Sequence, residues 1–127
     1  MSKQPASKKA MTVPATVITD RKTLRANARK SIEDGAITPT YSADRKRVIK
    51  LLNDALATEW VCVLRYYRHH YMAKGMLADA VKAEFLEHAQ QEQAHAGMLA
   101  ERIVQLGGEP DFNPDTLTAR SHAEYKE

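Results

Sequence analysis

Two glutamates and one histidine stand where the helical rhythm of the sequence predicts apolar side chains. Glu92 and His95 are three residues apart in the segment 87–98, EHAQQEQAHAGM, and Glu59 holds the same kind of position in an earlier segment. Residues three apart on a helix share one face. Burying an ionised carboxylate without a partner is costly, and a bound cation is one such partner. Two carboxylates and an imidazole suit divalent iron, manganese or zinc.

A Glu-x-x-His spacing alone is weak evidence, because such pairs also arise by chance. A hydrogen bond between helices or a solvated groove would explain the same residues without a metal ion. The metal hypothesis gains support because Glu92 occupies a core position and Glu59 occupies a core position on the neighbouring segment. At this point both explanations stay open.

The first of these segments is a predicted helix that starts near Ser42 or Asp44, which are capping candidates, and stops at Gly75. Glu59 fills the one gap in the apolar stripe of this helix, three residues after Leu56 and four before Val63. The stripe consists of Ile49, Leu52, Leu56, Val63, Tyr66 and His70.

The second segment is a predicted helix that begins at Leu77 or Asp79 and ends near Leu106, before two glycines at 107 and 108. Glu92 lies in the middle of its stripe, which consists of Phe85, Ala89, Ala96, Leu99, Ile103 and Leu106. Each helix would be about 45 Å long at 1.5 Å per residue. Two such helices on a short connection predict an antiparallel hairpin, and its apolar stripes need partners.

The composition agrees with an all-α chain that forms one domain. Its 127 residues are 43% hydrophobic and 28% charged, and strong helix formers dominate residues 45–106. No stretch of 18 apolar residues predicts a membrane span, and no apolar region follows the N-terminal lysines as in a secretory signal. The single Cys62 excludes an internal disulfide and suits a reducing compartment. We therefore expect a soluble cytoplasmic protein.

The charge is uneven along the chain. The net charge is +3, yet residues 1–30 carry eight Lys or Arg against one acid, Asp20. We expect residues 1–41 to be a flexible basic arm, with a possible short helix over 20–34 that Asp20 caps and Gly35 follows. This arm is a solubilising or assembly surface, or it contacts nucleic-acid phosphates, although no interleaved aromatic residues support the second interpretation.

The residues also carry a resemblance to a known family. The pieces LLNDALATEW, LRYY and EQAHAGMLAERIVQLGGEPDF resemble the first two helices of ferritin-like proteins, and among these the bacterioferritins. The resemblance implies that Glu59 is a terminal iron ligand, Glu92 a bridging ligand and His95 a ligand of a di-iron centre. It also implies that Tyr66 matches a tyrosine beside that centre. It covers about residues 46–115.

Two departures from the family pattern bear on cofactors and completeness. In bacterioferritins the residue after the bridging glutamate is a methionine that ligates haem. Here that residue is Gln93, so haem is not expected by that route. The chain also has no second Glu-x-x-His, so it encodes half of a di-iron site. The sequence is then either a fragment, with 109–127 a truncated crossover after the hairpin of 42–108, or a hairpin that pairs with a second copy to form a four-helix bundle.

Three functions follow from these expectations. The first is iron storage and detoxification by a ferroxidase that oxidises Fe(II) with dioxygen or peroxide in a homo-oligomer, a dimer or a larger shell. A peroxidase or manganese catalase would keep the ligands and change the substrate. The second is a DNA-protecting, starvation-type ferritin-like particle that uses the basic arm. The third is a hairpin whose half site is no longer functional.

Overall fold

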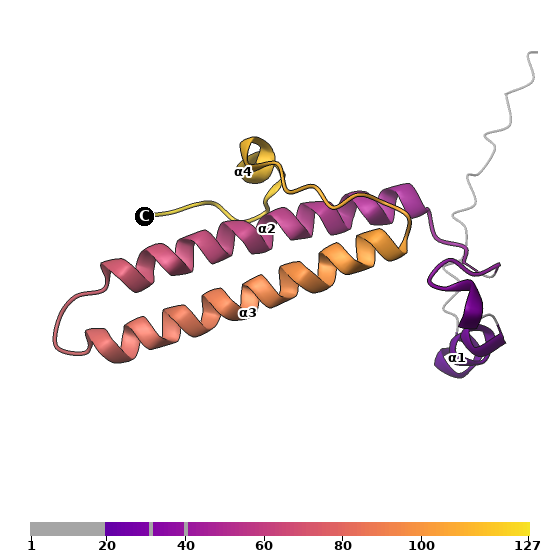
Figure 1. Cartoon of the computed structure of the whole chain (residues 1–127), viewed down its shortest axis with the longest axis horizontal. Coiled ribbons are helices and arrows are strands. Elements are labelled where there is room, and N and C mark those ends of the chain that lie inside the picture. The colour runs from indigo at the N-terminus through magenta and orange to yellow at the C-terminus, as the bar shows by residue number, and fades with distance from the viewer. Residues whose placement is uncertain (1–19, 31, 40) are drawn as a thin grey trace, which may run out of the picture.

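The fold is a long antiparallel hairpin of two helices with a short helical crossover and a separate basic helix (Figure 1). The computed structural model describes residues 20–30, 32–39 and 41–127. The described residues form helices and no strand, as the sequence predicts. Of the basic arm predicted over residues 1–41, residues 1–19, 31 and 40 lie outside the described residues. No helix in the described part of the chain combines the length and hydropathy needed to cross a membrane.

Helix α2 (Arg45–Met72) begins at the aspartate that the sequence favours as its cap. The Asp44 carboxylate accepts a hydrogen bond from the backbone N–H of Arg47 at 3.2 Å, which satisfies one of the free amides of the first turn. The helix runs for 28 residues and ends at Met72, three residues before the predicted end at Gly75. Gly75 instead forms the connection to the next helix, with a φ of 109° that a side chain would make strained.

Helix α3 (Ala78–Gln105) returns antiparallel to α2 over another 28 residues. It ends in a Schellman motif, in which the Gly107 N–H donates to the Val104 carbonyl and the Gly108 N–H donates to the Ile103 carbonyl. Gly107 has a φ of 76°, which explains a glycine at this position. Gly108 is needed for another reason, because a Cβ there would lie 2.8 Å from Ile49 of α2. The two glycines therefore end α3 and pack its end against the start of α2.

The apolar core of the hairpin lies at the end where α2 begins and α3 ends. Leu56, Ala96 and Ile103 are fully or almost fully buried there, at 0 to 1% exposure. Further apolar side chains pack around them, namely Ile49, Leu52, Trp60, Leu99 and Ala100. Six of these eight residues belong to the predicted stripes, and the other two are Trp60 and Ala100, so the 3.6-residue pattern identified the contact faces in this part of the hairpin.

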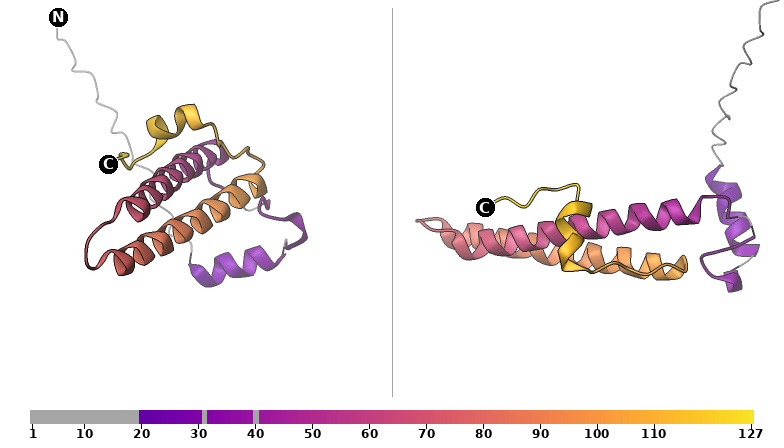
Figure 2. Two further views of the ribbon diagram at one scale, coloured as in Figure 1. Left: turned by 60° about the vertical axis from the view of Figure 1, so that its left-hand side comes forward. Right: turned by 90° about the horizontal axis from the view of Figure 1, so that it is seen from above.

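The crossover after α3 is held along α2 by polar contacts (Figure 2). The Asn53 side chain donates to the Glu109 carbonyl at 3.1 Å and accepts from the Asp111 N–H at 2.8 Å. Arg120 donates to the carbonyl of Asn53 and to that of Asp111, both at 3.0 Å. Within the crossover the chain forms a 3₁₀ turn (Pro114–Thr116) and α4 (Leu117–Arg120). Together these contacts cover the flank of α2 that turns away from α3.

Helix α1 (Arg21–Lys30) lies beyond the end of the hairpin where α2 begins (Figures 1 and 2). Asp20 precedes it as predicted, and its carboxylate accepts a hydrogen bond from the Thr23 N–H at 3.3 Å. The helix predicted over residues 20–34 is divided in the structure, since a 3₁₀ turn (Ile32–Asp34) follows α1. Gly35 then turns the chain with a φ of 75°.

Candidate metal centre

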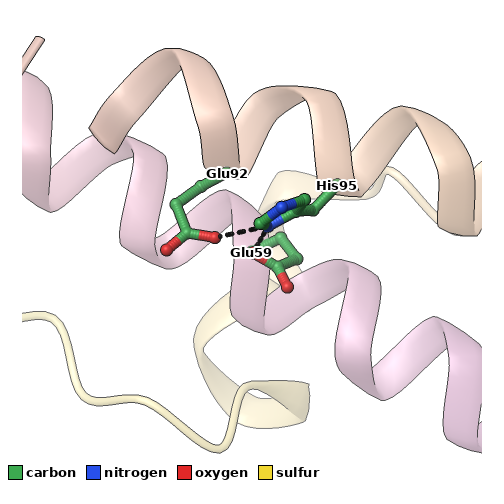
Figure 3. Close-up of side chains that lie close together, drawn as sticks. All are labelled: Glu59, Glu92 and His95. Carbon is green, nitrogen blue, oxygen red and sulfur yellow. Dashed lines mark hydrogen bonds and ion pairs between the residues drawn. The ribbon is translucent and has the colours of Figure 1, made fainter. Parts of the chain in front are cut away.

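Glu59, Glu92 and His95 converge in the middle of the hairpin (Figure 3). Each offers one ligand atom, and these atoms all lie within 4.8 Å of one another. The Nδ1 atom of His95 lies 3.0 Å from the Oε2 atom of Glu92 and 3.8 Å from the Oε2 atom of Glu59. Glu92 and His95 meet because a spacing of three places both on one face of α3, whereas Glu59 comes from α2. Among the described residues, this is the one group of three or more His, Cys, Asp or Glu side chains arranged to hold a metal ion.

The two carboxyl groups interact, and their pKa values move in opposite directions. Burial raises the pKa of Glu59 from 4.5 to about 7, and the hydrogen bond with Glu92 and the negative charge of Glu92 act in the same direction. The pKa of Glu92 is lowered, above all by its hydrogen bond with Glu59, with a further contribution from His95. Below about pH 7 the pair therefore tends to hold one proton, on Glu59, beside an ionised Glu92. Protons occupy the place where a cation would neutralise the same groups, so the donor set fits a divalent metal ion.

The group is half-buried and lies on the side of the hairpin that no described segment covers. The side chains of Glu59 and Glu92 are 25% and 24% exposed, and that of His95 is 51% exposed. A structural zinc site would close four ligands around the ion, whereas three ligands and an open side leave room for further ligands and a substrate. The site is therefore accessible from solvent and incomplete as a coordination shell.

Cys62 lies close enough to both carboxyl groups for their charges to affect it. Burial raises the pKa of its thiol, and the charges of Glu92 and then Glu59 raise it further. A neutral thiol is a poor metal ligand, because the thiolate is the binding form. The spacing of three residues between Glu59 and Cys62 was the sequence signal that Cys62 borders the site.

Tyr66 lies on α2, between the group of three residues and the connection to α3. Its ring stacks on that of His88, with the centroids 5.2 Å apart, and also contacts Phe85 at 6.2 Å. His88 lies 3.3 Å from Glu84 on the solvent side of α3. The resemblance to bacterioferritins implied that Tyr66 lies near the site, whereas its stacking on His88 depends on the relative position of the two helices.

The other polar residues considered from the sequence lie elsewhere. Gln93, next to Glu92, points to solvent. The Nδ1 atom of His70 contacts the Lys82 carbonyl at 2.7 Å, and His69 packs beside Phe85. Trp60 packs against the core and meets Phe112 of the crossover edge to face. None of these side chains joins the group of three.

With this geometry described, the chain can be compared with known proteins. The family model described as a ferritin-like domain matches residues 49–126, which include most of α2, all of α3 and the crossover. The chain belongs to the ferritin-like family. The matched region contains Glu59, Glu92 and His95, so the half-buried carboxylates and the imidazole lie inside the family's own domain.

Two relatives are similar to part of the chain. A bacterioferritin of Desulfovibrio desulfuricans is 41% identical over 68 residues, which are 53% of this chain and 38% of that protein. A dodecameric thioferritin, the bacterioferritin-related protein of Bacteroides fragilis, has a solved structure with a TM-score of 0.63 and 33% sequence identity. That match covers 66% of this chain and 50% of the thioferritin chain. The chain therefore spans about two fifths to one half of the relatives that it matches.

Proposed function

We propose that this protein takes up Fe(II) and oxidises it to Fe(III) for iron storage and detoxification, with dioxygen or peroxide as the oxidant. The observation that carries the proposal is the convergence of Glu59, Glu92 and His95 within 4.8 Å inside a ferritin-like domain. The bacterioferritin and thioferritin relatives support the iron-storage class. The matched segments cover half or less of each relative, so the activity of a whole relative is not assigned to this chain.

Each of the three side chains has a distinct role in this proposal. Glu59 and Glu92 neutralise and bridge the incoming Fe(II) ions, and His95 binds one of them as a neutral ligand. Below about pH 7 the proton on Glu59 must leave when Fe(II) arrives, so uptake is coupled to proton release. Tyr66, the nearest tyrosine by helical spacing, serves as a redox or hydrogen-bonding side chain beside the site.

The site needs further ligands to hold two metal ions. Ferritin-like di-iron bundles use a glutamate from each of two helices and a Glu-x-x-His motif from each of the other two. Helices α2 and α3 supply one glutamate and one such motif. We propose that a second pair of helices covers the open side and supplies the rest, either from another copy of the chain or from a further part of the same protein.

Titration with Fe(II) under air tests the proposal. The full chain should give an early ferric absorbance that saturates at a fixed ratio of iron to protein. Glu92→Ala should abolish this signal, because the bridging carboxylate and the partner of His95 are both lost. A matched control is Glu101→Ala, which removes an exposed carboxylate from the same helix. An early ferric signal that is equal in both variants and the unchanged chain would overturn the proposal.

Metal analysis together with native mass separates this proposal from a hairpin that no longer holds iron. The chain should bind stoichiometric Fe(II), or Mn(II) and Zn(II) as ions that dioxygen does not oxidise under these conditions. The mass of the metal-loaded species should show how many copies share a site. The single cysteine suits a reducing compartment, so we propose the cytoplasm as the place of this reaction. A purified chain that stays metal-free in excess Fe(II) would exclude the proposed iron uptake.

A further inference from the structure

Four aromatic rings follow one another between α2 and α3, on the side of the metal centre that leads to the connection of the hairpin. Tyr66 and His69 belong to α2, and Phe85 and His88 belong to α3. Successive ring centroids in the order His69, Phe85, Tyr66 and His88 lie 5.3, 6.2 and 5.2 Å apart. Aromatic rings attract one another at such separations. The proposed iron chemistry uses Tyr66 alone, although its ring is held from the other helix.

His88 meets Tyr66 because α2 and α3 run antiparallel. Tyr66 follows Glu59 by about two turns along α2. His88 precedes Glu92 by about one turn along α3, so both rings lie on the same side of the metal centre. The two rings are stacked, with 26° between their planes and 5.2 Å between their centroids. The Nε2 atom of His88 lies 3.3 Å from the Oε1 atom of Glu84, so the imidazole has one contact to each helix.

The position of the Tyr66 ring depends on these contacts with α3. Among the described residues, no group hydrogen-bonds to the Tyr66 hydroxyl, so ring contacts determine where the phenol lies. Phe85 contacts the ring at 6.2 Å and at an angle of 35° between the planes, whereas His88 makes the closer and more parallel contact. The pKa of Glu92 is lowered first by its hydrogen bond with Glu59, and the charge of His88 contributes least. His88 therefore borders the metal centre and holds Tyr66 beside it.

The other tyrosines of α2 lack this arrangement. Tyr67 follows Tyr66 in the sequence and lies about 100° further around the helix, away from the face that carries the metal centre. Tyr71 is 73% exposed, and its ring meets His70 of the same helix edge to face at 4.8 Å. Within α2, Tyr66 is thus the tyrosine whose ring is stacked on an imidazole of the facing helix.

The proposed reaction with peroxide requires a second electron when one Fe(II) ion is bound. Peroxide accepts two electrons as its O–O bond breaks, whereas one Fe(II) ion supplies one electron and becomes Fe(III). If Tyr66 supplies the other, its phenol loses an electron and the hydroxyl proton. The products are then Fe(III), a tyrosyl radical, one water and one hydroxide ion. A group that reacts in this way must be held in a fixed position beside the iron.

We propose that His88 is a positioning residue that holds the Tyr66 ring beside the metal centre, so that Tyr66 and no other tyrosine supplies this electron. This role of His88 rests on the proposed oxidation of Fe(II), and it adds the residue that selects the tyrosine. Glu84 supports the role by its contact with the imidazole.

Electron paramagnetic resonance on the full chain tests the proposal. The chain is loaded with a limiting amount of Fe(II) without air, mixed with hydrogen peroxide and frozen. The unchanged chain should give a tyrosyl radical, and Tyr66→Phe should lose it. His88→Ala should lower the radical yield by about tenfold or more, because a displaced reacting group reacts far more slowly. His88→Phe keeps a flat ring at this position and should retain most of the yield.

Two controls and one measurement without iron make the result specific. Tyr71→Phe removes an exposed tyrosine of α2, and His122→Ala removes an exposed imidazole near the end of the chain, so both should leave the radical yield unchanged. In the metal-free chain, nuclear Overhauser contacts should join the ring protons of Tyr66 and His88. The absence of these contacts would overturn the proposal. A yield in His88→Phe as low as in His88→Ala would also overturn it.

The ferric absorbance in excess Fe(II) separates this proposal from the proposed function. Ferric absorbance without a radical on Tyr66, or with equal radical yields in His88→Ala and the unchanged chain, would overturn the role of His88 alone. The absence of both ferric absorbance and radical in the unchanged chain would overturn the proposed iron oxidation and the role of His88 with it.

Discussion

The interface between α2 and α3 has two zones that use the same helical positions for different purposes. At one end, Leu56 of α2 meets Ala96 and Ile103 of α3, and all three are buried. One turn further along, Glu59 and Glu92 occupy the same stripes and remain about a quarter exposed. The first zone stabilises the hairpin by removing apolar area from water. The second zone holds carboxyl groups that water no longer fully solvates. These groups lower the stability of the metal-free hairpin but form a place where a cation can bind.

The largest effect should come from the apolar zone. Leu56→Ala should lower the free energy of unfolding by about 2–5 kcal/mol, because the side chain is fully buried and leaves a cavity. Leu51→Ala, the same change on a residue that is 55% exposed, should cost less than about 1 kcal/mol. Denaturant unfolding of the metal-free chain measures both. Equal costs in the two variants would mean that Leu56 does not lie in a packed apolar zone as described.

The next effect is a pH dependence that belongs to the polar zone. Because the folded pKa of Glu59 is about 7 and its ordinary value is 4.5, the folded state holds a proton that the unfolded state has lost between these values. Stability should therefore fall as the pH rises from about 4.5 to about 7, by about 3 kcal/mol at most. The lowered pKa of Glu92 acts below 4.5 and has the opposite sign. Thermal unfolding of the metal-free chain across this range measures the trend, and Glu59→Gln should flatten it.

Replacing Glu59 with an apolar side chain should make the polar zone resemble the apolar zone. Glu59→Met keeps a similar length and continues the stripe of α2, so the metal-free chain should gain about 1–2 kcal/mol at pH 8. The same variant should lose the stabilisation that Zn(II) or Mn(II) gives the unchanged chain, because one of three ligand side chains is gone. Thermal shifts with and without metal measure both. A variant that is less stable without metal would show that Glu59 stabilises the fold, contrary to the comparison.

The smallest effect is expected one residue away from the site. Gln93→Ala replaces an exposed side chain next to Glu92, and it should change neither stability nor metal binding by more than about 0.5 kcal/mol. Isothermal titration with Mn(II) and denaturant unfolding provide the measurement. A large loss of metal affinity here would mean that the site extends beyond the face that α2 and α3 share.

Much of the hairpin could be predicted from local sequence. The Asp44 cap, the glycines at 107 and 108 and the two 28-residue helices are encoded by residues that lie close together in the chain. The end of α2 was predicted three residues too late, because a glycine in a connection resembles one that ends a helix. Where one short helix was predicted over residues 20–34, the described residues form α1 and a 3₁₀ turn, and helix propensity does not distinguish these two kinds of helix.

The sequence by itself determined which residues carry the chemistry, because helical periodicity puts Glu59, Glu92 and His95 on the faces where apolar side chains belong. Only the tertiary structure decided that these three meet, since the register between α2 and α3 depends on how Leu56, Ala96 and Ile103 pack. The same register decided the interaction between Glu59 and Glu92, the position of Cys62 beside them and the stacking of Tyr66 on His88. Periodicity specifies a face of one helix, whereas distances between helices arise from side-chain packing across them.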